Sequence, residues 1–171
     1  DAQGKVIGAV ETLEDISERK QAEEALSKEA DKNMILLKNG ADGVHVGQND
    51  MAPEDVRRLM PGGLIGLSVE SLAQLAAAER APVDYYGISP VFATRSKHDA
   101  APALGLDGLR AIRAGTRRPL VAIGGIDAGN AAQVMAAGAD GLAVVSALCS
   151  SADPEAAARD LRAHMSPGGR G

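Results

Sequence analysis

Five short apolar runs recur along the chain, and each is followed by a turn and a stretch with helical spacing. The apolar runs are residues 43–47, 64–68, 85–89, 120–124 and 141–146. The helical stretches are residues 53–60, 70–80, 106–114, 128–137 and 153–164. Because the runs are continuously apolar rather than alternating, they are typical of parallel strands covered on both faces. Strands that alternate with helices through short connections predict an α/β fold with a parallel sheet.

Two local signals support this alternation. Asp153 followed by Pro154 is a strong helix start, with the aspartate at the N-cap and the proline at the first helical position. The tetrapeptide Gly-Ala-Asp-Gly occurs at residues 40–43 and 138–141, each time directly before an apolar run. It predicts a flexible helix exit and then a turn into the next strand.

The first forty residues add one more predicted strand, at residues 5–14, and a charged helix from Glu18 to about Leu37 that Ser17 could cap. The total is then six βα units. A (β/α)₈ barrel needs eight units and roughly 250 residues, or about 200 at the short end. A chain of 171 residues therefore predicts an incomplete barrel of the TIM type, with an open, doubly wound sheet of six strands as the alternative.

Composition excludes several classes of function. The 18 Lys and Arg are outnumbered by 23 Asp and Glu, and the chain has one Phe, two Tyr and no Trp. Proteins that bind the phosphate backbone need a surplus of basic residues, and proteins that bind single strands need aromatic side chains on which bases stack. The sequence therefore predicts neither class of nucleic-acid binder. Cys149 is the only cysteine, and no apolar run approaches the length of a membrane span. We therefore expect a cytoplasmic protein that binds neither nucleic acid nor membranes.

Two polar residues follow the first two clear strands, at the edge where parallel sheets bind their ligands. Asp50 could hold a hard cation such as Mg²⁺ together with substrate phosphates, or it could help to start the helix at Pro53. Ser68 could bind a ligand or cap the next helix. His45, which lies between two valines inside a strand, is expected to be a satisfied interior histidine.

Two further features predict an anion site. The loop at residues 89–99 gathers side-chain donors at Thr94, Arg95, Ser96, Lys97 and His98, which suits an anionic substrate. Gly124-Gly125 and Val145-Ser146 follow the last two strands, a frequent phosphate position in barrels. The alternatives are a merely solvated loop and glycines that only make tight turns.

Taken together, these motifs resemble thiamine phosphate synthase over roughly residues 31–165. The segments that carry the resemblance are residues 40–50, 66–68, 86–97, 122–126 and 139–146. The resemblance implies a (β/α)₈ barrel that joins hydroxymethylpyrimidine diphosphate to a thiazole phosphate and releases pyrophosphate.

The resemblance also implies roles for individual residues. Two aspartates, Asp31 and Asp50, fall on Mg²⁺ ligands. Ser68 and Lys97 fall on catalytic residues that hold the pyrimidine diphosphate, with Lys97 stabilising the departing pyrophosphate. The remaining substrate-binding positions, most of them at the thiazole phosphate, are Thr94, Arg95, Ser96, Gly125, Val145 and Ser146.

The chain departs from the family pattern at its start. The family's first two strands, with a Gln-x-Arg-x-Lys motif, are absent, and Ala30 stands where the family has Asn. Residues 4–26 instead resemble the C-terminal end of a PAS sensor domain and its exit helix. We therefore predict a PAS-like strand and linker helix at 1–30, a barrel portion at 31–165 and a disordered tail at 166–171.

Two questions stay open at this point. A thiazole tautomerase or a noncatalytic phosphate-binding signalling module could share this barrel, although Lys97 favours the synthase. An open sheet with unpaired edges also invites association. Either the helix at 17–38 covers the gap or two chains cover each other, and we expect the homodimer.

Overall fold

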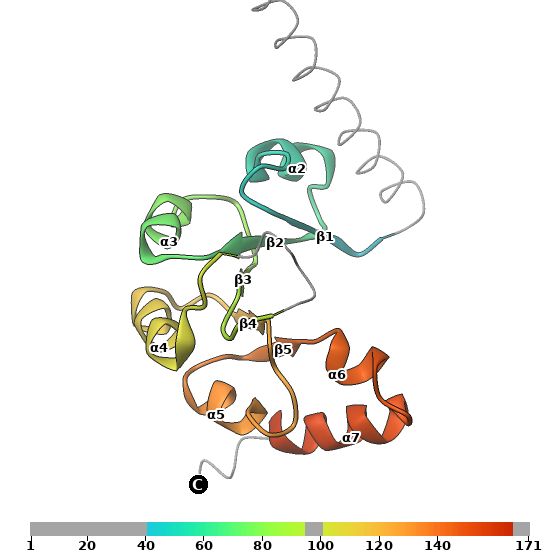
Figure 1. Cartoon of the computed structure of the whole chain (residues 1–171). Coiled ribbons are helices and arrows are strands. Elements are labelled where there is room, and N and C mark those ends of the chain that lie inside the picture. Colours follow the sequence, from blue (N-terminus) through green and yellow to red (C-terminus); the bar gives the residue numbers. More distant parts are fainter. Residues whose placement is uncertain (1–40, 95–100, 166–171) are drawn as a thin grey trace, which may run out of the picture.

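The computed structural model describes residues 41–94 and 101–165, which form a five-stranded parallel sheet with helices between the strands (Figure 1). The strands are β1 (Gly43–Val46), β2 (Leu64–Val69), β3 (Tyr85–Ile88), β4 (Leu120–Ile123) and β5 (Gly141–Ala143). The helices are α2 (Pro53–Leu59), α3 (Leu72–Ala78), α4 (Gly105–Gly115), α5 (Ala131–Ala136), α6 (Ser146–Cys149) and α7 (Pro154–Met165). The strand predicted at 5–14, the boundary near residue 30 and the tail at 166–171 lie outside the described residues and stay predictions.

The order of the strands decides between the two predicted architectures. The sheet runs β1-β2-β3-β4-β5, so every connection steps in the same direction. A doubly wound sheet reverses direction at a switch point and carries helices on both faces. Here the helices lie along the outer side of the curved sheet (Figure 1). The TIM-barrel type is therefore confirmed, with five of the predicted units in the described region, and the doubly wound alternative is wrong.

The two faces of the sheet differ in character. Alternate residues of β1 to β4 turn toward the helices and are buried; they are Val44, Val46, Ile65, Leu67, Val69, Tyr86, Ile88, Leu120 and Ala122. In the first three strands the opposite, concave face carries mostly small or polar residues, which are Gly43, His45, Gly66, Ser68, Tyr85 and Gly87, together with the exposed Leu64. The continuously apolar runs predicted strands covered on both faces, but the helices of the described residues cover one face, and the concave face holds polar groups such as His45 and Ser68.

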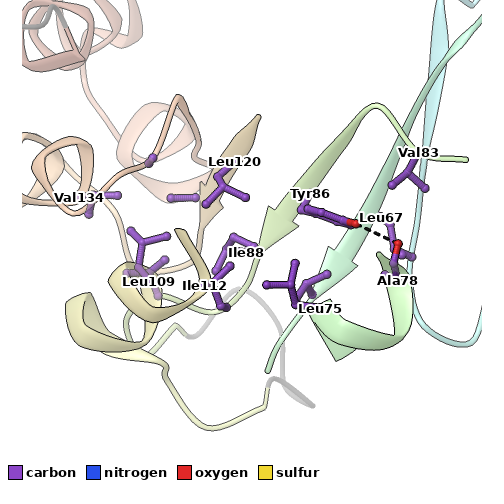
Figure 2. Packing of buried hydrophobic residues seen from close by; sticks show 14 of the residues in the cluster. Leu67, Leu75, Ala78, Val83, Tyr86, Ile88, Leu109, Ile112, Leu120 and Val134 are labelled. Atoms are coloured by element: carbon purple, nitrogen blue, oxygen red, sulfur yellow. Dashed lines mark hydrogen bonds between the residues drawn. The ribbon is translucent and has the colours of Figure 1, made fainter. Parts of the chain in front are cut away.

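The core lies between the sheet and the helices. Figure 2 shows Leu109 and Ile112 of α4 beside Ile88 and Leu120 of the central strands, and all four side chains are fully buried. The hydroxyl of Tyr86 donates a hydrogen bond of 2.9 Å to the carbonyl of Ala78 at the end of α3. Burial of this layer fixes the strands and so fixes the positions of the loops that follow them.

Two aspartates that directly precede strands tie those strands to their neighbours. Oδ2 of Asp84 accepts from the backbone N–H of Ile65 at 2.7 Å and from the guanidinium of Arg57 at 2.7 Å. Oδ2 of Asp140 accepts in the same way from the N–H of Leu120 at 2.9 Å and from Arg113 at 2.9 Å. The aspartate of the second Gly-Ala-Asp-Gly repeat thus holds an adjacent strand as well as forming a turn.

Replacing Asp84 by alanine is expected to lower the free energy of unfolding by about 1–3 kcal/mol, because the N–H of Ile65 and the Arg57 guanidinium lose their acceptor. The N–H bond from Ile65 holds the pKa of Asp84 below its ordinary value of 3.8. The contribution of the Asp84 carboxylate to the free energy of unfolding is therefore complete above pH 3.8 and is lost as the pH falls through the folded-state pKa. Urea unfolding at pH 7 and below pH 3.8 measures both effects. Asp107→Ala removes an exposed carboxylate whose described ion pair is with Arg110, and it should change stability by less than about 0.5 kcal/mol. An equal loss in both variants would contradict the prediction.

Two predicted boundaries differ from the structure by three residues each, and one predicted helix start is confirmed. β5 ends at Ala143 rather than at residue 146, and Ser146 begins α6 instead. α5 begins at Ala131 rather than at residue 128, because residues 127–130 form a turn in which Asn130 Oδ1 accepts from the N–H of Asp127. The predicted helix start at Asp153 is confirmed, since its Oδ1 accepts from the N–H of Ala156 at 2.9 Å.

Candidate active site

The carboxyl ends of the strands meet at one edge of the sheet, and the described candidate residues fall there in two groups. Asp50 lies in the loop after β1, and Ser68 lies near the end of β2. Thr94, Gly125, Val145 and Ser146 follow β3, β4 and β5. The other candidates, Asp31, Arg95, Ser96 and Lys97, lie outside the described residues, so their roles stay predictions.

A pocket lies at the carboxyl ends of β4 and β5 and has a volume of about 320 Å³. It brings together Thr94, Gly125, Val145 and Ser146, which come from three separate parts of the chain. The other lining residues are Ser89, Ile123, Gly124, Ile126, Ala143 and Val144. The four residues predicted to share an anion site are therefore neighbours in the fold.

The glycine pair shapes one wall of this pocket. Gly124 and Gly125 have φ angles of 97° and 64°, in the left-handed region that favours glycine. A Cβ atom on Gly125 would lie 2.7 Å from the carbonyl oxygen of Ala93, so the segment after β3 packs directly against this turn. The two glycines thus make a tight turn, and the same turn forms a wall of the pocket.

Gly125→Ala is expected to lower the free energy of unfolding by at least about 1–2 kcal/mol, because alanine is strained at this φ and its Cβ meets the Ala93 carbonyl. It should also weaken the binding of inorganic phosphate, measured by calorimetric titration. Gly129→Ala is the matched control, since its Cβ would lie 3.2 Å from Asp127 Oδ1 and it is absent from the positive-φ glycines of the described residues. Equal stability of the two variants would contradict this role for Gly125.

Asp50 is exposed and shapes the loop after β1. Its Oδ2 accepts from the N–H of Gly47 at 2.6 Å, whereas the N-cap position of α2 is Ala52. The helix-capping alternative is therefore wrong. Among residues 41–94 and 101–165, no cluster of three or more His, Cys, Asp and Glu side chains is arranged to hold a metal ion. The Asp50 carboxylate at this edge fits the way Mg²⁺ is often held, by one or two carboxylates together with substrate phosphates.

Ser68 lies on the concave face of β2 and does not cap a helix. The cap of α3 is Ser71, whose Oγ accepts from the N–H of Gln74 at 3.2 Å. Oγ of Ser68 instead lies 2.9 Å from Nε2 of His45, and the Gln48 side chain donates to the Ser68 carbonyl at 2.5 Å. The capping alternative for Ser68 is wrong because the N-cap of the helix, Ser71, lies three residues further on.

His45 has hydrogen-bond partners at both ring nitrogens, as expected of a satisfied histidine, although the residue is exposed on the concave face. Its Nδ1 lies 3.1 Å from the hydroxyl of Tyr85, a residue that the sequence analysis missed. Tyr85 could have been found from the two-residue period of β3, which places it on the same face as His45. Partial desolvation of the His45 ring by its surroundings lowers the pKa of His45, against a smaller opposite effect of the Asp50 charge. Desolvation also raises the pKa of Tyr85. Near neutral pH the imidazole is therefore uncharged and the phenol keeps its proton.

Comparison with known proteins identifies relatives over most of the chain. The model of a family described as thiamine monophosphate synthase matches residues 6–148. A thiamine-phosphate synthase from Albidiferax ferrireducens is 55% identical over 133 residues, which are 77% of this chain and 61% of the relative. One from Methanocella arvoryzae is 50% identical over 137 residues, which are 80% of this chain and 65% of the relative.

The solved structures agree with the sequence relatives. A thiamine phosphate pyrophosphorylase from Pyrococcus furiosus superposes with a TM-score of 0.71 at 38% identity, covering 78% of this chain and 63% of that one. A 3-hexulose-6-phosphate synthase, at 23% identity and a TM-score of 0.59, shares the fold. The chain spans roughly three fifths of the length of the curated relatives that it matches. Within the part of the chain that the structure describes, no helix is long and apolar enough to cross a membrane.

Proposed function

The chain belongs to the thiamine monophosphate synthase family, and from that premise we propose that it is a transferase that condenses hydroxymethylpyrimidine diphosphate with a thiazole phosphate. The observation that carries the proposal is the pocket after β4 and β5, in which Thr94, Gly125, Val145 and Ser146 lie together. Relatives at about 50% identity bear the name of this enzyme. No feature of the described residues favours a tautomerase or a noncatalytic module over the synthase.

The pocket is the proposed site of the thiazole phosphate. Its lining supplies the hydroxyls of Thr94 and Ser146 and a glycine turn that lets the backbone approach an oxyanion closely. Ser96 and Arg95 are proposed to complete this site from the loop that follows Thr94. An anion in this position would be held mainly by directed hydrogen bonds, which also set the orientation of the thiazole ring.

The pyrimidine diphosphate is proposed to lie at the carboxyl ends of β1 and β2, where Ser68 and Asp50 are found. In the reaction the bond between the pyrimidinylmethyl carbon and the diphosphate oxygen breaks, and its electron pair leaves with pyrophosphate. The thiazole nitrogen then supplies the pair for the new carbon–nitrogen bond. Lys97 and Ser68 are proposed to stabilise the charge that develops on the leaving group.

Asp50 and Asp31 are the residues proposed to hold Mg²⁺. When bound, Mg²⁺ neutralises the negative charge of a departing pyrophosphate. The exposed position of Asp50 at the carboxyl edge of the sheet supports its part in this site.

The purified protein, incubated with both phosphorylated substrates and Mg²⁺, tests the proposal. We expect formation of thiamine phosphate and release of pyrophosphate in equal amounts. Calorimetric titration with the thiazole phosphate alone should show binding that Gly125→Ala weakens and Gly129→Ala leaves unchanged. Binding of the thiazole phosphate without any turnover would overturn the transferase and identify a noncatalytic module.

A further inference from the structure

We propose that His45 and Tyr85 are positioning residues that turn the hydroxyl of Ser68 outward, so that it donates a hydrogen bond to an anionic oxygen of the pyrimidine diphosphate. The inference rests on the proposed function for the identity of that ligand. It assigns a task to two residues on the concave face that the resemblance to the family did not single out.

The register of the sheet places the three side chains in adjoining rows. His45, Gly66 and Tyr85 pair directly across β1, β2 and β3, and Ser68 pairs with Gly87 in the row nearer the carboxyl edge. The imidazole therefore reaches over the middle strand to Tyr85 and toward Ser68. Its ring centroid lies 5.5 Å from that of Tyr85.

The two glycines make this arrangement possible. A Cβ atom on Gly66 would lie 2.2 Å from Cζ of Tyr85 and 2.3 Å from Nδ1 of His45, where those two side chains meet. A Cβ atom on Gly87 would lie 2.7 Å from Cε1 of His45. Both glycines are buried. The sheet thus leaves room on its concave face for one ring that bridges three strands.

The chain of hydrogen bonds has a preferred direction. A tyrosine hydroxyl that keeps its proton is a good donor, so the Tyr85 O–H donates to Nδ1 of His45. In an uncharged imidazole the proton must then sit on Nε2, which donates to Oγ of Ser68. Because Oγ accepts this bond, the Ser68 O–H is available to donate toward the carboxyl edge. A hydroxyl directed in this way suits a phosphate oxygen, which only accepts.

Steady-state kinetics on the full chain test the positioning role. Tyr85→Phe removes the donor at one end, and we expect kcat to fall about tenfold while the KM for the thiazole phosphate stays unchanged. His45→Leu removes both hydrogen bonds, and we expect it to lower kcat by more than tenfold. His45→Gln keeps a donor and an acceptor on one side chain, so it should recover a large part of the lost rate. In a Ser68→Ala background, Tyr85→Phe should have no further effect, because the group that it orients is gone.

The matched control is Tyr86→Phe. It removes the hydroxyl of the neighbouring residue in β3, which points into the helix-facing core and bonds to Ala78 and Arg118. This variant should lose stability and keep kcat. Equal loss of kcat in the Tyr85 and Tyr86 variants would overturn the proposal.

A spectroscopic test does not depend on turnover. In ¹⁵N-labelled protein, the His45 resonances should show a proton on Nε2 and none on Nδ1, and inorganic pyrophosphate should shift them in the wild type but not in Ser68→Ala. A proton on Nδ1 would overturn the inference even if the enzyme is active. If no condensation is detected while the Nε2 proton and the pyrophosphate response are present, the proposed reaction fails and the positioning of Ser68 toward an anion stands.

Discussion

Asp50→Ala is expected to lower the rate of condensation by about a hundredfold or more, because a metal that neutralises the leaving group would lower the activation free energy by several kilocalories per mole. The fold should tolerate the change, since the Asp50 carboxylate is exposed and its described bond is to the N–H of Gly47 in its own loop. Added Mg²⁺ should restore little activity. The measurement is the rate of pyrophosphate release over a range of Mg²⁺ concentrations, with thermal unfolding recorded in parallel.

Asp42→Ala is the control for charge. Asp42 is an exposed carboxylate at the opposite, amino end of β1, so its removal changes the net charge by the same amount away from the carboxyl edge. This variant should condense the substrates at the wild-type rate. If Asp50→Ala is as active as Asp42→Ala, Asp50 does not hold the metal.

Ile88→Ala is expected to lower the free energy of unfolding by about 2–5 kcal/mol, the range for removing a large buried aliphatic side chain. Ile88 is 0% exposed in the central strand and packs beside Ile112 and Leu120 in the layer between sheet and helices (Figure 2). Since the total stability of a domain is about 5–15 kcal/mol, this single cavity removes a large fraction of it. Urea unfolding monitored by circular dichroism measures the loss.

The matched substitution on the surface is Leu72→Ala. Leu72 is 53% exposed at the start of α3, and alanine is a good helix former, so its free energy of unfolding should change by less than about 0.5 kcal/mol. Comparable losses at the two positions would mean that the central layer does not carry the stability of the sheet.

The amino-acid sequence by itself determined the elements and the edge of the sheet where ligands bind. Apolar runs such as 120–124 and the Asp153-Pro154 start act within a few residues, so the last helix and every described strand except β5 are found within about two residues of their predicted bounds. The site residues could be placed at one edge because the carboxyl ends of parallel strands always share an edge. Thr94, Gly125, Val145 and Ser146 line one pocket, as expected for residues that follow neighbouring parallel strands; their roles stay predictions.

The tertiary structure alone decided the order of the strands, and with it the barrel rather than the doubly wound sheet. It also decided that Ser68 bonds to His45 while Ser71 caps the helix. Serine is a favourable N-cap residue at either position, so only the observed start of the helix tells which of the two is the cap. The contact between His45 and Tyr85 spans forty residues and depends on the register of three strands and on Gly66 between them. Such contacts arise from the packing of the sheet against its helices, which no pattern within a few residues encodes.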